Sequence, residues 1–283
     1  MPFYVSYDSA DVWSHRSIFA LDEEGNMTGV AGTPPDAFSD DGQLWGMPVF
    51  NWAALQEQDY LWWVNRLKKN IEMFDLVRLD HFRAFADYWE VPAQDKTAKN
   101  GSWKPGPSSQ FFKVMERELG ELPFIAEDLG DINDPVYQLR DEFRLPGMKV
   151  LAFAFDESLP TSDYIPHNYH PNFVVYTGTH DNNTIRGWYR KDADQATRSR
   201  LQQYAGRQVA EHEVHLALGR MAYASVAKTV VLPLQDVLGL DESARMNVPS
   251  SGENNWAWRL TLGQLTLEAE NTLKEWVWLY NRK

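Results

Sequence analysis

The sequence contains no cysteine among its 283 residues. Without cysteine there are no disulfides and no thiolate metal sites, a composition that fits a reducing compartment. Long apolar runs are also absent, since no stretch approaches the roughly 20 residues that a membrane-spanning helix needs. Residues 1–5 lack the basic and apolar regions of a signal peptide. We therefore expect a cytoplasmic protein that does not associate with membranes.

Positive charge is scarce in this chain. It has 27 Lys and Arg against 40 Asp and Glu, a formal net charge of -13. Such a charge repels phosphate backbones, so nucleic acid is not an expected partner. Aromatic residues are abundant, with 12 Trp, 12 Tyr and 14 Phe. Most of these rings should pack in a core, while some could offer flat apolar faces to sugar rings.

Short apolar runs alternate with polar, helix-favouring stretches along the sequence. This alternation predicts βαβ units and a parallel sheet. A closed (β/α)8 barrel of the TIM type would need two strands more than the six that the runs supply. Strands are expected at residues 3–8, 74–80, 122–127, 149–155, 173–179 and 229–234, and helices at residues 55–73, 108–119, 135–142 and 193–228 with a break near Gly206.

Two irregular stretches interrupt this pattern. Residues 9–54 carry several glycines and prolines and predict a long loop insertion, which is more often functional than idle. Gln43 and Trp45 lie at its centre, where the aromatic and amide content suits a substrate-binding lid. Residues 95–107 predict a second surface loop. No interdomain linker stands out, so residues 1–283 are expected to be the C-terminal portion of a single barrel domain.

The first acidic run places Arg78 and Asp80 two positions apart on a predicted strand, so both side chains point to the same side. An arginine beside a carboxylate keeps it ionised and oriented, which suits a nucleophile. A buried structural ion pair is the alternative interpretation.

The second acidic run places Glu127 after Pro123, Phe124 and Ile125. These apolar neighbours would raise the pKa of the carboxyl group and keep it protonated as a general acid. Alternatively, Glu127 caps the following helix.

The third run ends in the polar residues 180–184, whose imidazole, carboxylate and amide groups suit the recognition of sugar hydroxyls. Helix capping is again the alternative. If the three runs end at one face of a barrel, two carboxyl groups and a third acid meet there, as in a retaining glycosidase.

The sequence resembles the 4-α-glucanotransferases, or amylomaltases, of glycoside hydrolase family 77 over almost its whole length. The most specific segments are Arg78-Leu79-Asp80-His81-Phe82-Arg83, Ile125-Ala126-Glu127-Asp128-Leu129-Gly130 and Tyr176-Thr177-Gly178-Thr179-His180-Asp181-Asn182. Residues 8–13, 42–48, 146–150 and 244–249 match as well. Ala84 and Ser250 stand where the family usually has glycine, which affects only local loop shape.

The resemblance implies a barrel of the α-amylase type, with Asp80 as the nucleophile, Glu127 as the acid/base and Asp181 as the transition-state stabiliser. Arg78 would orient Asp80, and the other implied substrate contacts are His81, His180, Asn182, Gln43, Trp45 and Asn247. Family members are longer, and their first two barrel strands would precede Met1. We therefore expect about six of the eight βα units, with a missing N-terminal segment or a second chain completing the barrel.

The implied activity is transfer of α-1,4-glucan segments between maltooligosaccharides or starch-type glucans by a retaining double displacement, with no metal or organic cofactor. The alternatives are an α-glucan hydrolase and a catalytically impaired glucan-binding fragment. His212 and His215 are three positions apart, which is not the His-Glu-x-x-His zinc pattern, and a solvated helix face explains them better.

Overall fold

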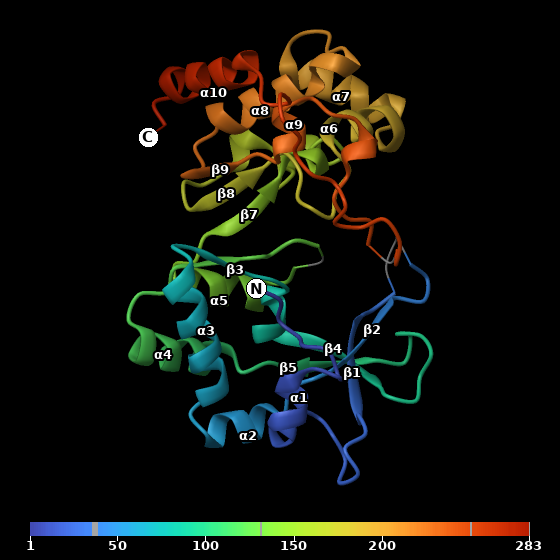
Figure 1. Cartoon of the computed structure of the whole chain (residues 1–283), viewed down its shortest axis with the longest axis vertical. Helices are drawn as coiled ribbons and strands as arrows, with labels where there is room; N and C mark the ends of the chain where they lie inside the picture. Colours follow the sequence, from blue (N-terminus) through green and yellow to red (C-terminus); the bar gives the residue numbers. More distant parts are fainter. Residues whose placement is uncertain (36–38, 131, 250, 283) are drawn as a thin grey trace. The chain divides into compact units, whose positions relative to one another are not determined.

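The computed structural model describes residues 1–35, 39–130, 132–249 and 251–282. The chain divides into two compact units, Met1–Gly147 and Met148–Lys283. Both mix helices and strands (Figure 1).

The first unit contains a parallel strand pair, β3 (Val77–Leu79) and β6 (Phe124–Ala126). Both strands are three residues long. Their residues share a core with Phe85, Phe111 and Phe112, which are fully buried. The helices of this unit are α1 (Ala10–Ser14), α2 (Trp52–Glu57), α3 (Leu61–Met73), α4 (Ser108–Leu119) and α5 (Asp134–Glu142). Short 3-10 helices occur at Arg16–Ile18 and Phe82–Phe85.

An antiparallel sheet of four strands is the second part of this unit (Figure 1). Its order is β2-β1-β4-β5, formed by β1 (Gly29–Thr33), β2 (Gln43–Pro48), β4 (Asp87–Pro92) and β5 (Ser102–Pro105). The prediction of a loop over residues 9–54 was therefore wrong for β1 and β2, and the loop over residues 95–107 contains β5.

Glycine is the reason that β1 was missed. At Gly32 an added Cβ atom would lie 2.4 Å from the backbone oxygen of Gln43, and at Gly29 it would lie 3.0 Å from the side chain of Glu90. Both positions therefore need glycine so that neighbouring strands can approach closely. In the sequence, the same residues are typical of loops.

The strand expected at residues 3–8 is also absent. Phe3 and Tyr4 are consecutive and both buried, whereas a half-buried strand would turn one of them to solvent. Their rings pack edge to face, with centroids 4.8 Å apart, and each lies near Phe50. Aromatic packing rather than strand pairing fixes this segment.

The helix expected at residues 55–73 is two helices. Asp59 and Tyr60 have φ of 48° and 53° and separate α2 from α3. The helix expected at 108–119 is confirmed as α4. The break near Gly206 is confirmed too, because α7 ends there with Gly206 at φ 66°.

The second unit contains a three-stranded sheet of order β7-β8-β9, formed by β7 (Gly147–Val150), β8 (Phe173–Tyr176) and β9 (Thr229–Val231). β8 and β9 are parallel. Its helices are α6 (Ile185–Gly187), a π-helical turn at Trp188–Asp192, α7 (Gln195–Ala205), α8 (Val214–Ala224), α9 (Leu234–Val237) and α10 (Leu267–Leu279). Short 3-10 helices occur at Leu151–Phe153, Leu159–Thr161, Pro166–Asn168, Glu211–Glu213 and Glu242–Ala244.

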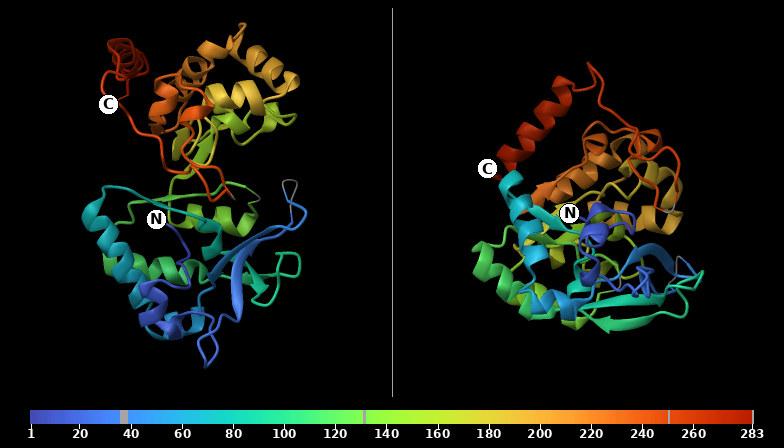
Figure 2. Two further views of the ribbon diagram at one scale, coloured as in Figure 1. Left: turned by 45° about the vertical axis from the view of Figure 1, so that its right-hand side comes forward. Right: turned by 60° about the horizontal axis from the view of Figure 1, so that its bottom comes forward.

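Residues 245–249 and 251–266 contain no helix or strand, and Ser250 lies outside the described residues. This stretch leads to α10, drawn in red in Figure 2. Trp276 is buried and anchors α10, since a Cβ atom added at Gly219 of α8 would lie 2.7 Å from its ring.

Four of the six expected strands are thus present near their expected positions. The strand expected at 149–155 instead spans Gly147–Val150, because Leu151–Phe153 form a 3-10 helix, and the described strands do not close a barrel. Within the described ranges, no helix combines the length and the hydrophobicity that crossing a membrane would require.

Candidate active site

The parallel pairing of β3 and β6 brings Asp80 and Glu127 to neighbouring positions. Leu79 is the register partner of Ala126, and the two acidic residues come next on their strands. The Glu127 amide donates a hydrogen bond of 3.1 Å to the Leu79 carbonyl, which continues the pairing to this point. Both carboxyl groups therefore leave the same end of the strand pair, as the sequence predicted.

Glu127 lies in a mostly buried position that favours its protonated form. The pKa of this carboxyl group is raised to about 7, chiefly by burial. The charge of Arg78 opposes this shift, and the charge of Asp80 adds to it. Two backbone amides also oppose it, because His81 N–H donates to Oε2 at 2.7 Å and Leu129 N–H donates to Oε1 at 3.0 Å. The helix-cap alternative does not hold, since α5 has Asn133 at its N-cap position.

Asp80 is paired with Arg78. The distance from Arg78 Nη1 to Asp80 Oδ1 is 2.5 Å, and the Asp80 side chain remains 44% exposed. A buried structural ion pair does occur nearby, but at Asp128, the second residue after β6. Asp128 accepts from Arg140 Nη1 at 2.6 Å, and its side chain is 1% exposed. The open Asp80 carboxylate can therefore meet a ligand, whereas Asp128 cannot.

His81 follows Asp80 in a left-handed backbone conformation, with φ of 52°. Burial lowers the pKa of its imidazole to about 4, so the ring is neutral near pH 7. The Trp45 ring contacts it edge to face at 4.8 Å between centroids, and Trp45 Nε1 donates to Gln43 Oε1 at 3.2 Å. No hydrogen-bond partner for His81 Nε2 occurs in the described part of the chain. Trp45 and Gln43 thus extend from β2 toward the end of β3.

In the second unit, Asp181 follows β8 and is held by three neighbours. Asn247 Nδ2 donates to Asp181 Oδ1 at 2.6 Å, and His180 Nε2 lies 3.2 Å from Oδ2. Arg245 Nη2 donates to the Asp181 carbonyl at 2.7 Å, and Arg245 Nε donates to the Asn247 carbonyl at 2.8 Å. Arg245 was not among the predicted site residues, although it lies in the matching segment 244–249.

The remaining polar residues of this run stabilise the loop and the next helix. Asn182 Oδ1 accepts from the amide and the hydroxyl of Thr179, at 2.8 and 3.0 Å. Thr184 Oγ1 accepts from Gly187 N–H at 3.1 Å and caps α6. The capping alternative is therefore correct for Thr184, while Asp181 points to Asn247 and His180.

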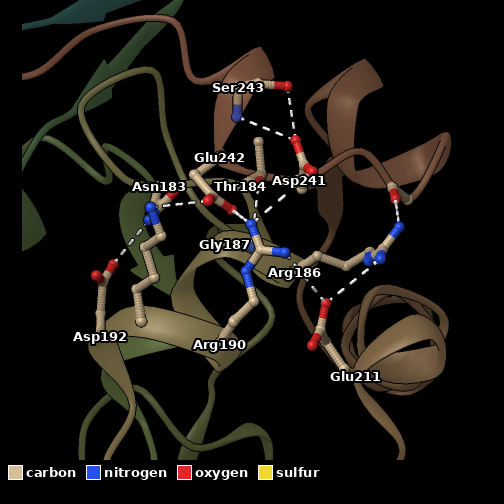
Figure 3. A network of polar contacts seen from close by, with 12 residues as sticks. Asn183, Thr184, Arg186, Gly187, Arg190, Asp192, Glu211, Asp241, Glu242 and Ser243 are labelled. Atoms are coloured by element: carbon tan, nitrogen blue, oxygen red, sulfur yellow. Dashed lines mark hydrogen bonds and ion pairs between the residues drawn. The ribbon is translucent and has the colours of Figure 1, made fainter.

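A network of ion pairs joins the two segments that carry Asp181 and Asn247 (Figure 3). Arg190, in the π-helical turn, contacts Glu242 and lies 3.9 Å from Asp241. Lys191 Nζ lies 2.8 Å from Glu242 Oε1, and Asn183 Nδ2 donates to Asp192 at 3.2 Å. Because residues 183–192 follow Asp181 and residues 241–243 precede Arg245, the network fixes both sides of this cluster.

The structure thus groups the predicted residues by unit. Arg78, Asp80, His81, Glu127, Trp45 and Gln43 belong to the first, and His180, Asp181, Asn182 and Asn247 belong to the second. A single pocket shared by all three acids stays a prediction. Across the residues that the structure describes, no group of three or more His, Asp or Glu side chains is arranged to hold a metal ion.

Comparisons with known proteins agree with these motifs. Residues 1–266 match the profile of glycoside hydrolase family 77, described as 4-alpha-glucanotransferase. A 4-alpha-glucanotransferase of Streptococcus pneumoniae serotype 4 is 46% identical over 285 residues, covering 100% of this chain and 55% of that protein. One from Thermus thermophilus is 48% identical over 273 residues, covering 95% and 54%.

Solved structures show a similar relation. The amylomaltase of Streptococcus agalactiae in complex with acarbose superposes with a TM-score of 0.95 at 39% identity, covering 100% of this chain and 57% of that one. The amylomaltase of Corynebacterium glutamicum, at 20% identity and a TM-score of 0.76, shares the fold over 90% of this chain and 40% of its own. The chain spans about half the length of the curated relatives it matches.

Proposed function

The chain belongs to glycoside hydrolase family 77, the 4-alpha-glucanotransferases, and from this premise we propose that it transfers α-1,4-glucan segments between maltooligosaccharides by a retaining double displacement. The observation that supports this most directly is the pairing of two chemically different carboxyl groups at one end of β3 and β6. Asp80 is exposed and contacts Arg78, whereas Glu127 has a pKa raised to about 7. Opposite environments for two acids are what acid and nucleophile roles require.

In the first step, protonated Glu127 donates its proton to the glycosidic oxygen while Asp80 attacks the anomeric carbon. The bond to the leaving sugar breaks, and a covalent glucosyl ester forms on Asp80. In the second step, the 4-hydroxyl of an acceptor sugar attacks that carbon, ionised Glu127 takes the hydroxyl proton, and Asp80 is released. A pKa near 7 makes both forms of Glu127 accessible at neutral pH.

Asp181 is the proposed ligand of the ring hydroxyls. Asn247 and His180 each contact one of its carboxylate oxygens, which leaves its orientation well defined. The Streptococcus agalactiae relative was solved with acarbose, and this supports an α-glucan-like substrate for the present chain.

Replacing Asp80 by Asn tests the proposal. Asp80→Asn should abolish glucose release from maltotriose, because the amide cannot form the ester, while Asp75→Asn, an exposed change just before β3, should retain it. Normal activity of Asp80→Asn would remove Asp80 from its role. A transferase produces almost no net increase in reducing ends, so a rise in reducing ends at the rate of bond cleavage would identify an α-glucan hydrolase instead.

A second candidate function is glucan binding without turnover. It is supported by the fact that the chain spans about half the length of its relatives and that its described strands do not close a barrel. Binding of maltoheptaose by the chain, with no products formed from it, would select this candidate.

A further inference from the structure

Trp256 is an exposed aromatic residue beside the Asp181 cluster. Its ring centroid lies 5.3 Å from that of His180, with an angle of 36° between the planes, and 54% of the residue is exposed. Burial of apolar area therefore does not explain its position. The ring contacts His180, and more than half of the residue faces solvent.

A ring of successive contacts holds Trp256 beside His180. His180 contacts Asp181 Oδ2, Asp181 Oδ1 accepts from Asn247, and the Trp256 amide donates to the carbonyl of Met246 at 2.7 Å. The contact between the side chains of Trp256 and His180 completes the series. Trp256 is thus held by its ring against His180, which contacts the Asp181 carboxylate, and by its backbone against Met246, the neighbour of Asn247.

The backbone of Trp256 is strained. Its φ is 59°, a left-handed conformation that is unusual for a bulky side chain. Arg259 stabilises it by donating from Nη1 to the Trp256 carbonyl at 2.7 Å. Strain of this kind persists where the surroundings enforce it, and it is concentrated at ligand-binding positions.

We propose that Trp256 is the stacking platform of a glucosyl-binding subsite next to Asp181. The flat apolar indole suits the C–H face of a glucose ring, while His180 and Asp181 beside it can bind the hydroxyl rim. This inference rests on the proposed function, since it assigns one more ring of the same α-glucan ligand. It adds Trp256 to a site whose other residues lie at strand ends and in short loops.

The test measures maltoheptaose binding by calorimetry with the full chain. Trp256→Gly removes the indole at a backbone position that glycine adopts without strain, so its thermal unfolding temperature should not fall. Its affinity for maltoheptaose should decrease at least about tenfold, as for a truncated aromatic contact at an interface. Trp256→Phe, which keeps an aromatic face, should bind within a few-fold of the unaltered chain.

Trp278→Ala is the matched control, because Trp278 is 80% exposed and lies on α10 in the same unit. Its maltoheptaose affinity should match that of the unaltered chain. Equal affinity of Trp256→Gly and the unaltered chain would overturn the platform and leave the proposed function intact. If the unaltered chain itself did not bind maltoheptaose, both would fall.

Discussion

Two adjacent acidic residues, Glu127 and Asp128, show how strongly local surroundings decide the chemistry of a carboxyl group. Asp128 is neutralised by Arg140 in a buried pair and is structural. Glu127 accepts hydrogen bonds from the backbone amides of His81 and Leu129 and lies beside Asp80, and burial raises its pKa to about 7. A carboxyl group therefore forms a structural ion pair at Asp128 and is a titratable group at Glu127.

The raised pKa of Glu127 predicts a measurable stability change. The native chain holds this proton up to about pH 7, whereas the reference carboxyl loses it near 4.5. Between these values the native state binds more protons at Glu127, so the contribution of Glu127 to the free energy of unfolding should fall as pH rises, by about 3 kcal/mol in total. Relative to the wild-type chain, Glu127→Gln should therefore gain stability across this range in urea titrations at several pH values.

Glu121→Gln is the control for this measurement, because it removes an exposed carboxyl group shortly before β6. If the stability of Glu127→Gln relative to wild type followed the same pH course as that of Glu121→Gln, the buried, protonated state of Glu127 would be disproved. The design separates titration from lost hydrogen bonds, since a lost bond shifts the whole curve and titration changes its slope.

At the scale of single residues, the sequence predicted the environment of Glu127 because its apolar neighbours are adjacent in the chain. It did not identify Arg245 or Trp256. Their importance comes from contacts with Asp181 and His180, which lie more than sixty positions away, and no local pattern reveals such partners.

At the scale of elements, the π-helical turn that follows the short helix α6 carries polar contacts to residues 241–243 (Figure 3). Gly187, where the two meet, has no room for a side chain. A Cβ atom there would lie 2.2 Å from Asn183 Oδ1 and 2.8 Å from Glu242 Cβ. Close packing at Gly187 therefore holds residues 183–192 against residues 241–243.

Gly187→Ala should accordingly destabilise the chain by about 1–3 kcal/mol, the usual cost of overpacking, and should weaken maltoheptaose binding by displacing the Asp181 segment. Gly252→Ala is its control, because no atom lies within 4 Å of the added Cβ atom and φ is not positive. Thermal unfolding and calorimetry of both variants would check this. Equal unfolding temperatures for Gly187→Ala and Gly252→Ala would show that the network adapts without cost.

The elements that the sequence predicted well are those with a strong local pattern. The amphipathic spacing of α4 and the apolar run of β8 gave nearly correct bounds. β1 was missed because Gly29 and Gly32 serve close strand contacts that exist only after folding. The division of residues 55–73 was missed for a similar reason, since neither Asp59 nor Tyr60 is a typical helix breaker.

At the scale of the whole molecule, the chain spans about half the length of its relatives, and its described strands form three separate sheets. Among the described residues β9 pairs only with β8. Val231 of β9 is 42% exposed, and a surface hollow of about 500 Å³ is lined by Thr229 and Val230 together with polar residues such as Lys228, Asn281 and Arg282. An exposed strand edge is a template for another strand.

We therefore expect this edge to bind the part of a relative that the present chain does not span. That polypeptide, taken from the Streptococcus pneumoniae 4-alpha-glucanotransferase and added in trans, should form a one-to-one complex and raise transfer from maltotriose at least about tenfold. Val231→Lys should weaken both effects, because a lysine on an edge strand opposes pairing. Val248→Lys is the control, since Val248 is 43% exposed and outside any strand. A complex that formed equally well with both variants would place the interaction elsewhere than β9, and no complex at all would show that the open edge is not used.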